Sequence, residues 1–227
     1  MKTFIQGQIY KTYWDTNTTV FYGADIEIKS GEIYIVAGRN SVGKSTLLRI
    51  LSLSEPGDQN TLTFQIDEKD ISFMPTNLNY YPYMKISDLL QFHQSLNKRF
   101  NLAFAKEKIF EFDIRRNIKI KNLSEGKKKI LSYIMCLSID AKLYILDEPF
   151  PYVDLIYDEN FRKMIINLYD EDKTFIIATH QINEFEKVAS QCLIVKNREI
   201  IESYDIEKIR TDEEISLEEF VKERMRL

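Results

Sequence analysis

The stretch of sequence that decides the fold is the run Gly38, Arg39, Asn40, Ser41, Val42, Gly43, Lys44, Ser45 and Thr46. Its first eight residues fit the pattern GxxxxGK(S/T) at every fixed position. An apolar run at 33–37 precedes it, as a buried parallel strand would, and residues 46–51 follow with helical spacing. This setting makes a chance match in a loop the weaker interpretation. We therefore expect the run to bind the phosphates of a nucleotide through its backbone N–H groups and the helix N-terminus.

Each polar side chain of this loop has an expected part. Lys44 is predicted to reach the β- and γ-phosphates, and the Ser45 hydroxyl to bind Mg²⁺. A second apolar strand at 143–146 ends in two carboxylates, Asp147 and Glu148. Ligands of α/β folds bind at the carboxyl ends of such strands. Asp147 is therefore predicted to hold Mg²⁺ through water, and Glu148 to orient or deprotonate the attacking water.

The segment 176–180 is another apolar strand, and it ends at His180. A single histidine at a strand end is more often structural than catalytic. Because this strand follows the acidic strand in sequence, we expect the two to be neighbours and His180 to lie near the γ-phosphate. The candidate catalytic residues are therefore Lys44, Glu148 and His180. Asp147 and Glu148, taken without the phosphate-binding loop, fit an ordinary acidic strand end equally well.

The rest of the chain indicates an α/β core with an inserted helical segment. Apolar residues alternate in 4–10 and 20–28, and a further strand is predicted at 70–74. Residues 86–138 have mainly helical spacing. After the strand at 143–146, a predicted helix at 158–169 leads to a strand at 174–178, which is a parallel crossover. The remaining predicted elements are a hairpin of 192–195 with 199–201 and a charged helix at 217–225.

Composition excludes several classes of protein. The chain has 227 residues, a length that suits one domain carrying a smaller lobe. A net charge of −4 gives no support for nucleic-acid binding. There is neither a long apolar span nor a signal peptide, and Cys136 and Cys192 read as buried free thiols. These features predict a cytosolic protein. The lysine run 127–129 reads as a solvated helix face rather than an anion-binding patch.

The segment NLSEGK at 122–127 resembles the signature motif of ATP-binding-cassette (ABC) proteins, usually written LSGGQ. The resemblance covers essentially the whole chain and implies a known fold. That fold is α/β, a P-loop NTPase core with a mostly parallel sheet, an antiparallel β subdomain near the N-terminus and an inserted helical lobe. It also implies a single ABC ATPase domain over 1–227, with the core at about 1–76 and 139–227 and the helical subdomain at about 77–138.

The resemblance also implies a function. The chain would be the ATP-hydrolysing subunit of an ABC transporter, with ATP and Mg²⁺ as ligands. Two such subunits, identical or homologous, would close head to tail, and Ser124, Glu125 and Gly126 would face the γ-phosphate bound by the opposing chain. A separate transmembrane permease would hold the chain peripherally on the inner face of the cell membrane. The segment 76–101 is the expected docking surface, and the short lobe and signature favour an exporter-type cassette.

Other positions are matched to the family residue by residue. Tyr13, with Trp14 as the next choice, would stack on adenine, and Asp154 would be the D-loop aspartate. Thr76 stands at the Q-loop position, where the family usually carries Gln. This change and a bulky D-loop put turnover and coupling in doubt. Tyr80, Tyr81 and Tyr83 either contact the permease or pack the lobe; the two interpretations have equal weight.

Alternative functions come from different classes. The strongest is a poorly hydrolysing, ATP-gated regulatory or interaction subunit with degenerate Q- and D-loops. Against it stands Glu148, the residue that activates water in hydrolysing members. Soluble ABC proteins that act on DNA or ribosomes carry coiled-coil insertions or two cassettes, which this length does not accommodate. A nucleotide kinase would share the phosphate-binding loop, but not the signature segment.

Overall fold

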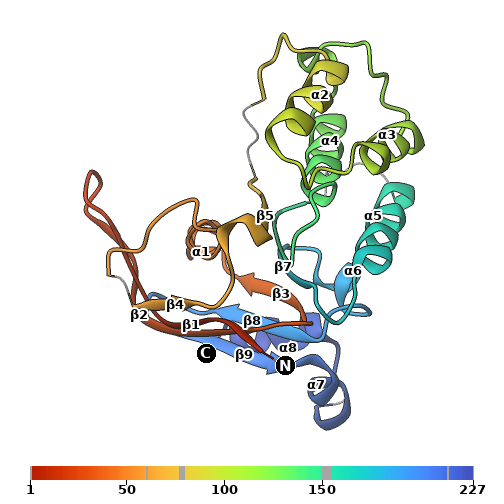
Figure 1. Cartoon of the computed structure of the whole chain (residues 1–227). Coiled ribbons are helices and arrows are strands. Elements are labelled where there is room, and N and C mark those ends of the chain that lie inside the picture. Colours follow the sequence, from red (N-terminus) through yellow and green to blue (C-terminus); the bar gives the residue numbers. More distant parts are fainter. Residues whose placement is uncertain (1, 60, 77–79, 150–154, 214, 227) are drawn as a thin grey trace.

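The computed structural model describes residues 2–59, 61–76, 80–149, 155–213 and 215–226, with only the backbone of 155–158. Its centre is a six-stranded sheet in the order β5-β6-β7-β3-β8-β9 (Figure 1). All neighbouring pairs are parallel except β8 and β9. The strands are β3 (Ile33–Gly38), β5 (Ile71–Met74), β6 (Leu143–Asp147), β7 (Thr174–Ala178), β8 (Gln191–Val195) and β9 (Ile201–Asp205).

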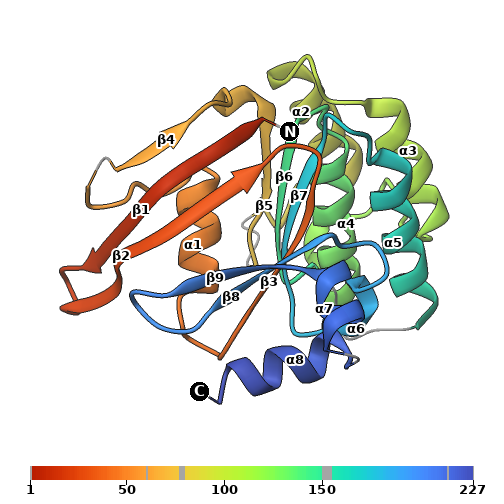
Figure 2. The same ribbon diagram turned by 90° about the horizontal axis from the view of Figure 1, so that it is seen from below.

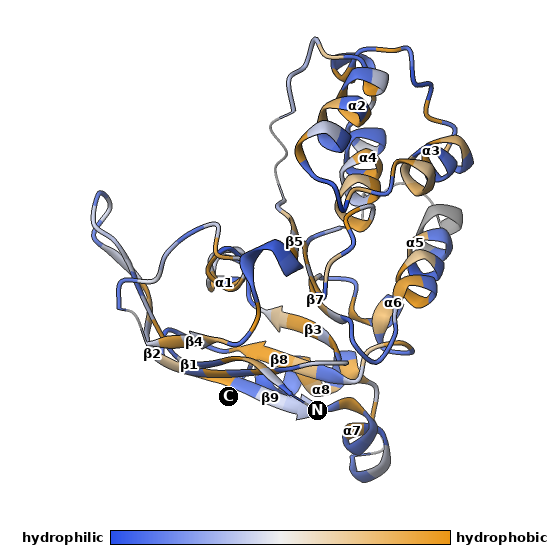
Figure 3. Cartoon of the chain, in the orientation of Figure 1, coloured by the Kyte–Doolittle hydropathy of each residue, from blue (hydrophilic) through white to orange (hydrophobic). Residues whose placement is uncertain are grey.

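The three central strands are apolar on both faces because both faces are covered. Every residue of β3, β6 and β7 is buried. Such continuous apolar runs are typical of parallel sheets between two layers. Figure 3 shows the hydrophobic colour along β3 and β8. The strands end on the same edge of the sheet, because Asp147 pairs with Ala178 and Val36 also pairs with Ala178.

A second, antiparallel sheet covers one face. It consists of β1 (Thr3–Tyr13), β2 (Thr18–Lys29) and β4 (Leu62–Phe64), in the order β2-β1-β4. Residues of β2 alternate between buried and exposed, as expected of a sheet with one solvated face. Helix α1 (Lys44–Leu51) lies between the two sheets (Figure 2). One apolar cluster joins residues of β1, β2 and α1 to one face of the central strands.

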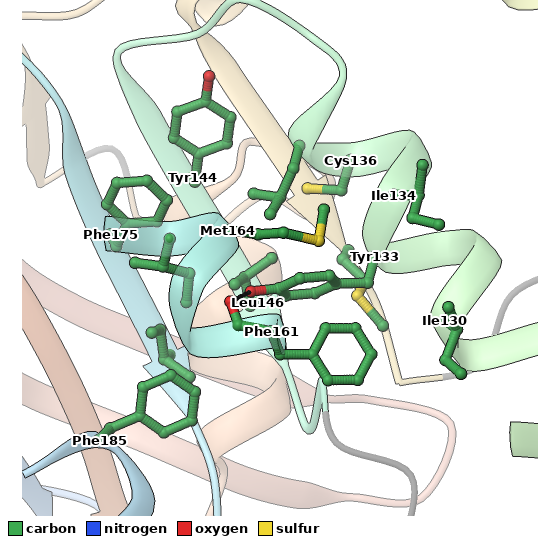
Figure 4. Packing of buried hydrophobic residues seen from close by; sticks show 14 of the residues in the cluster. Ile130, Tyr133, Ile134, Cys136, Tyr144, Leu146, Phe161, Met164, Phe175 and Phe185 are labelled. Atoms are coloured by element: carbon green, nitrogen blue, oxygen red, sulfur yellow. Dashed lines mark hydrogen bonds between the residues drawn. The ribbon is translucent and has the colours of Figure 1, made fainter. Parts of the chain in front are cut away.

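Helices cover the other face and continue into a lobe. The lobe helices are α2 (Ile86–Leu96), α3 (Leu102–Glu111) and α4 (Glu125–Leu137). Helix α5 (Leu155–Leu168) lies beside α4, where the Tyr133 hydroxyl donates to the Phe161 carbonyl at 3.0 Å and their rings meet edge to face (Figure 4). The shorter helices are α6 (Ile182–Phe185), α7 (Ile206–Asp212), α8 (Leu217–Arg224) and the 3-10 turns η1 (Glu68–Asp70) and η2 (Ile120–Asn122).

The fold class is confirmed: the core is α/β with a mostly parallel sheet, and an antiparallel sheet lies near the N-terminus. Several predicted bounds are wrong. The second hairpin strand begins at Ile201 rather than at 199, because residues 196–200 form the turn that the Asn197 side chain closes. The first helix begins at Lys44 rather than at the predicted residue 46, since Gly43 is its N-cap. Strand β4 and helices α6 and α7 were not predicted, being short.

Candidate active site

The phosphate-binding loop connects β3 to α1 and has a backbone that only glycine adopts easily. Gly43 has a φ of 116° and precedes Lys44, the first residue of the helix. A Cβ at Gly43 would lie 2.6 Å from Val20 Cγ1, so a larger residue is excluded by sterics as well as by backbone conformation. Gly43 caps α1 with no side chain, which leaves the first N–H groups of the helix open toward the loop.

Lys44 places its charge inside this loop. Its Nζ donates to the Gly38 carbonyl at 2.9 Å and to the Arg39 carbonyl at 3.2 Å, and the residue is 8% exposed. Burial lowers the pKa of Lys44, and the nearby carboxylates of Glu148 and Asp147 oppose that shift. The loop therefore holds a buried cation at the position where the sequence predicts contact with the β- and γ-phosphates.

Asp147 and Thr76 come from the ends of adjacent strands. Strands β5 and β6 pair in parallel, with Met74 opposite Leu146. The chain beyond each strand therefore emerges at the same edge, and the Thr76 hydroxyl donates to Asp147 Oδ2 at 2.5 Å. The buried Asp147 carboxylate and the Ser45 and Thr76 hydroxyls are oxygen donors of the kind that Mg²⁺ prefers. The donor chemistry therefore fits Mg²⁺, although the described residues contain no cluster of three acidic, His or Cys side chains.

Glu148 and His180 lie beside each other at the same edge of the sheet. The two side chains approach to 3.4 Å between Glu148 Oε1 and His180 Nε2. Within the described chain, Glu148 Oε1 is buried and has no hydrogen-bond partner. Burial raises the pKa of Glu148, while the charge and backbone N–H of His180 act in the opposite direction. A buried carboxylate with a raised pKa and an open oxygen has the properties of a general base for water.

The signature residues have a different environment. Ser124 caps α4, where its Oγ accepts a hydrogen bond from the Lys127 N–H at 3.3 Å. Ser124 and Glu125 are exposed. The one ion pair of Glu125 in the described chain is with Lys128, at 2.6 Å. Among the described residues, the hydrogen bonds and ion pairs of Ser124 and Glu125 stay within α4, so the structure does not bring the signature segment to the phosphate-binding loop of its own chain.

Tyr13 lies beside the first turn of α1. Its hydroxyl accepts from Arg49 Nη2 at 2.8 Å, and it lies 3.3 Å from Thr46 Oγ1 and 3.2 Å from Glu55 Oε2. Trp14, by contrast, is 77% exposed. The contact with Thr46 brings Tyr13 to the rim of the loop; its stacking on adenine stays a prediction.

The lobe tyrosines divide into two kinds. Tyr80 is partly buried and packs against the lobe core, with its ring near that of His93, which favours the interpretation that it packs the lobe. Tyr81 and Tyr83 are 71% and 68% exposed, and Lys121 Nζ lies 4.4 Å from the ring centre of Tyr83. Asp154, the predicted D-loop residue, lies outside the described residues.

Sequence reasoning missed two contacts of the site. Lys129 is not on a solvated face: its Nζ donates to the Glu148 carbonyl at 3.0 Å. The signal was available, because on a helix residue 129 shares a face with Tyr133, which is buried. Arg39, within the loop, donates from Nη2 to the Met225 carbonyl at 2.8 Å. Nothing in the sequence connects these two distant positions.

Comparison with known proteins agrees with this geometry. The sequence profile described as ABC transporter matches residues 21–151, more than half of the chain. The chain belongs to the ABC transporter family. It is an ATP-binding subunit, as are its relatives. An uncharacterized ABC transporter ATP-binding protein of Methanocaldococcus jannaschii is 29% identical over 208 residues, covering 85% of this chain and 77% of that protein.

Two further comparisons define the fold and the range of relatives. A probable sulfate/thiosulfate import ATP-binding protein of Chlorella vulgaris is 24% identical over 192 residues, with 78% and 81% coverage. A solved structure titled as the ATP binding subunit of an ABC transporter superposes with a TM-score of 0.85 at 16% identity. It covers 99% of this chain and 100% of that one, and at this identity it shows the fold alone. Among the described residues, no helix has the length and apolar character to cross a membrane.

Proposed function

We propose that this ABC subunit is a Mg²⁺-dependent ATPase that drives a separate transmembrane permease and works as a head-to-tail dimer, with itself or with a homologous subunit. The observation that carries the proposal is the contrast within one chain. Glu148 lies 3.4 Å from His180 at the sheet edge, with Lys44 buried nearby, whereas Ser124 is exposed. A single chain therefore provides the cleavage groups and leaves the signature groups for another nucleotide.

In the proposed reaction, residues of one chain bind the phosphates and activate water. Lys44 exchanges its bonds to the loop carbonyls for bonds to the β- and γ-phosphates. Glu148 orients the attacking water and accepts its proton at the oxygen that has no hydrogen-bond partner in the described chain. His180, whose Nε2 lies 3.4 Å from Glu148 Oε1, would donate toward the γ-phosphate. Ser45 and Asp147 would hold Mg²⁺, which neutralises phosphate charge when bound.

The second chain supplies the signature groups. The Ser124 hydroxyl and the N-terminus of α4 are a hydrogen-bond donor and a positive dipole end, which suit the γ-phosphate of the opposing subunit. Binding of two ATP molecules then closes the dimer, and loss of the γ-phosphate removes the bridge between the chains. Tyr13 and Asp154 keep their proposed parts at the adenine and between the two sites.

The lobe is the proposed docking surface for the permease. Tyr81 and Tyr83 are exposed there, and exposed tyrosines are favoured in protein interfaces. Backbone hydrogen bonds from Ile86 to Ile118 and from Lys121 to Pro82 hold this part of the lobe together. We propose an exporter-type cassette on the inner face of the cell membrane, although a relative named for sulfate/thiosulfate import keeps the opposite direction a real alternative.

A second candidate is an ATP-gated regulatory subunit that hydrolyses poorly. The observation that favours it is the short Thr76 side chain, which contacts Asp147 where the family usually carries a longer Gln. The buried Glu148 and its contact with His180 favour the motor instead, because a regulatory subunit has no need for a base at this position.

The experiment is Mg-ATP hydrolysis by the purified chain at rising chain concentration, with Glu148→Gln as the blank. A rate per chain that rises with concentration, and falls roughly 100-fold or more in the blank, supports the self-pairing motor. ATP binding measured in parallel should be retained by Glu148→Gln. Tight binding without turnover at any concentration contradicts the autonomous homodimer and favours a regulatory subunit or one paired with a homologue.

A further inference from the structure

The lysine run at the start of α4 has three separate sets of partners. Lys127 Nζ donates to the Asp113 carbonyl at 2.6 Å, and Lys128 Nζ pairs with Glu125 at 2.6 Å. Both of these partners lie in the lobe. Lys129 Nζ instead donates to the main-chain carbonyl of Glu148, at 3.0 Å, in the core. Lys129 is therefore the residue of this run that connects the signature helix to the hydrolytic edge of the sheet.

The backbone of Glu148 has a disfavoured conformation that the hydrogen bond from Lys129 helps to hold. Glu148 has a φ of 47°, in the left-handed region that residues with a Cβ disfavour. Its N–H is held by the Ala178 carbonyl at 2.9 Å, and its carbonyl is held by Lys129. The peptide groups on either side of this residue are therefore both fixed, one to β7 and one to α4. Strained backbone persists at functional sites where the surrounding structure determines it in this way.

The surroundings make this lysine unusual. Burial lowers its pKa, and the carboxylates of Asp147 and Glu148 oppose the shift. A long flexible side chain that is partly buried near two carboxylates loses much rotamer freedom. The hydrogen bond to the Glu148 carbonyl offsets part of this loss of conformational entropy. A hydrogen bond from a charged donor to a carbonyl is stronger than a neutral one.

We propose that Lys129 is a positioning residue for ATP hydrolysis: by binding the Glu148 carbonyl it fixes the Glu148 carboxylate for the attacking water and ties that carboxylate to the signature helix. The inference rests on the proposed function. It gives α4 two parts, because its N-terminus faces the ATP of the opposing chain and its second turn holds the base of its own chain. Movement of one signature helix would then reach both sites of the dimer.

The test compares Lys129→Met, which keeps length and packing but removes the donor, with Lys129→Arg, which keeps a charged donor. Lys108→Met is the matched control, because Lys108 is a lobe lysine paired with Glu107 and Glu111. Lys129→Met should lower kcat roughly 10- to 100-fold, as misplacement of a reacting group does, with KM and ATP affinity within about twofold. Lys129→Arg should recover a large part of kcat, and Lys108→Met should match the wild type.

The outcomes separate this inference from the proposed function. Wild-type turnover that is lost in Glu148→Gln supports the ATPase whatever Lys129→Met does. Within that result, an unchanged kcat in Lys129→Met overturns the positioning role. So does an equal loss in Lys129→Met and Lys129→Arg, which would point to packing alone. A wild-type chain that binds ATP without Glu148-dependent turnover contradicts the autonomous homodimer, and with it the positioning role of Lys129 in that homodimer. Thermal unfolding of each variant shows whether a loss of kcat follows a loss of fold, and a folded, slow Lys129→Met beside an active Lys129→Arg supports the inference.

Discussion

Compared with the start of α4, the carboxyl edge of the central sheet is crowded with functional groups that contact one another. There, Thr76 donates to Asp147, Glu148 lies beside His180, and Lys44 is buried in its own loop. At the start of α4, Ser124 and Glu125 are exposed, and their contacts stay within the first turn of the helix. Both regions carry motifs of the same family, but the groups at the sheet edge contact one another, whereas the signature residues do not contact those groups.

The difference has a topological cause. In neighbouring parallel strands, the residues that follow each strand lie at the same edge of the sheet. The polar groups that follow β5, β6 and β7 are therefore close together. The N-terminus of α4 lies in the lobe, whereas the middle of the helix packs on α5 through Tyr133 and Phe161. A helix N-terminus whose capping residue is exposed can take an anion from outside, and we propose that here it is the nucleotide of a second chain.

The largest expected effect comes from blocking the exposed region. Ser124→Arg places a bulky side chain where the opposing phosphate is proposed to bind. Hydrolysis should fall roughly 100-fold, while ATP binding to the isolated chain stays within about twofold, because the phosphate-binding loop is untouched. Steady-state hydrolysis and equilibrium ATP binding measure the two effects. Equal loss of binding and turnover would place Ser124 in the site of its own chain and break the comparison.

A smaller effect is expected within the crowded region. Thr76→Val removes the hydroxyl that donates to Asp147 and keeps the shape of the side chain. Hydrolysis should fall about 3- to 10-fold, the effect of one lost hydrogen bond beside a metal-binding carboxylate. In a titration of Mg²⁺ at fixed ATP, the variant should need a higher Mg²⁺ concentration for half-maximal hydrolysis, because its site binds the ion more weakly.

The control is Thr211→Val on α7, whose hydroxyl bonds to Lys208 and Asp212 of the same helix. An unchanged rate and Mg²⁺ dependence in Thr76→Val would mean that the Q-loop position contributes nothing to the metal site.

The smallest effect concerns the support behind the loop. Glu55 accepts from Lys11 at 2.8 Å and from Arg49 at 2.7 Å. Burial alone would raise the pKa of Glu55, but the hydrogen bonds from Lys11 and Arg49 bring it below its ordinary value. A depressed carboxyl pKa stabilises the fold above the unfolded pKa, and the contribution disappears as the pH falls through the folded value.

Glu55→Gln should therefore lower the free energy of unfolding by about 1–2 kcal/mol at pH 7 and by less in acid, as measured by urea denaturation. Glu159→Gln, in an exposed pair with Lys163, should change it by less than about 0.5 kcal/mol. A loss for Glu55→Gln that is independent of pH would contradict the ionic role of this carboxylate.

Features that depend on a local pattern of residues could be predicted from the sequence, whereas contacts between distant segments could not. The strand, loop and helix around Gly43 could be predicted because apolar runs and glycine spacing are local signals. The Thr76–Asp147 contact depends on the pairing of β5 with β6, and residue spacing within a single segment does not predict which strands pair. The same holds for Arg39 and Met225, which the fold brings together although they are 186 residues apart in sequence.

Lys129 shows a second kind of failure. Three consecutive lysines favour a solvated face by composition, yet helical geometry points them in three directions, and the third direction is the core. The periodicity of α4 was stronger information than its charge. The lobe tyrosines show why the sequence left two interpretations open: Tyr80 packs against the lobe core, whereas Tyr81 and Tyr83 are exposed.

The central claim is that one hydrolytic site takes its crowded region from one chain and its signature from another. The most direct test mixes two variants, Lys44→Ala and Ser124→Arg, each inactive alone. In a mixed dimer one site carries both changes and the other carries neither. We expect recovery to about a quarter of the wild-type rate per chain at equal mixing, since half of the dimers are mixed and each has one intact site. A mixture as inactive as its components, beside an active wild type, would contradict it.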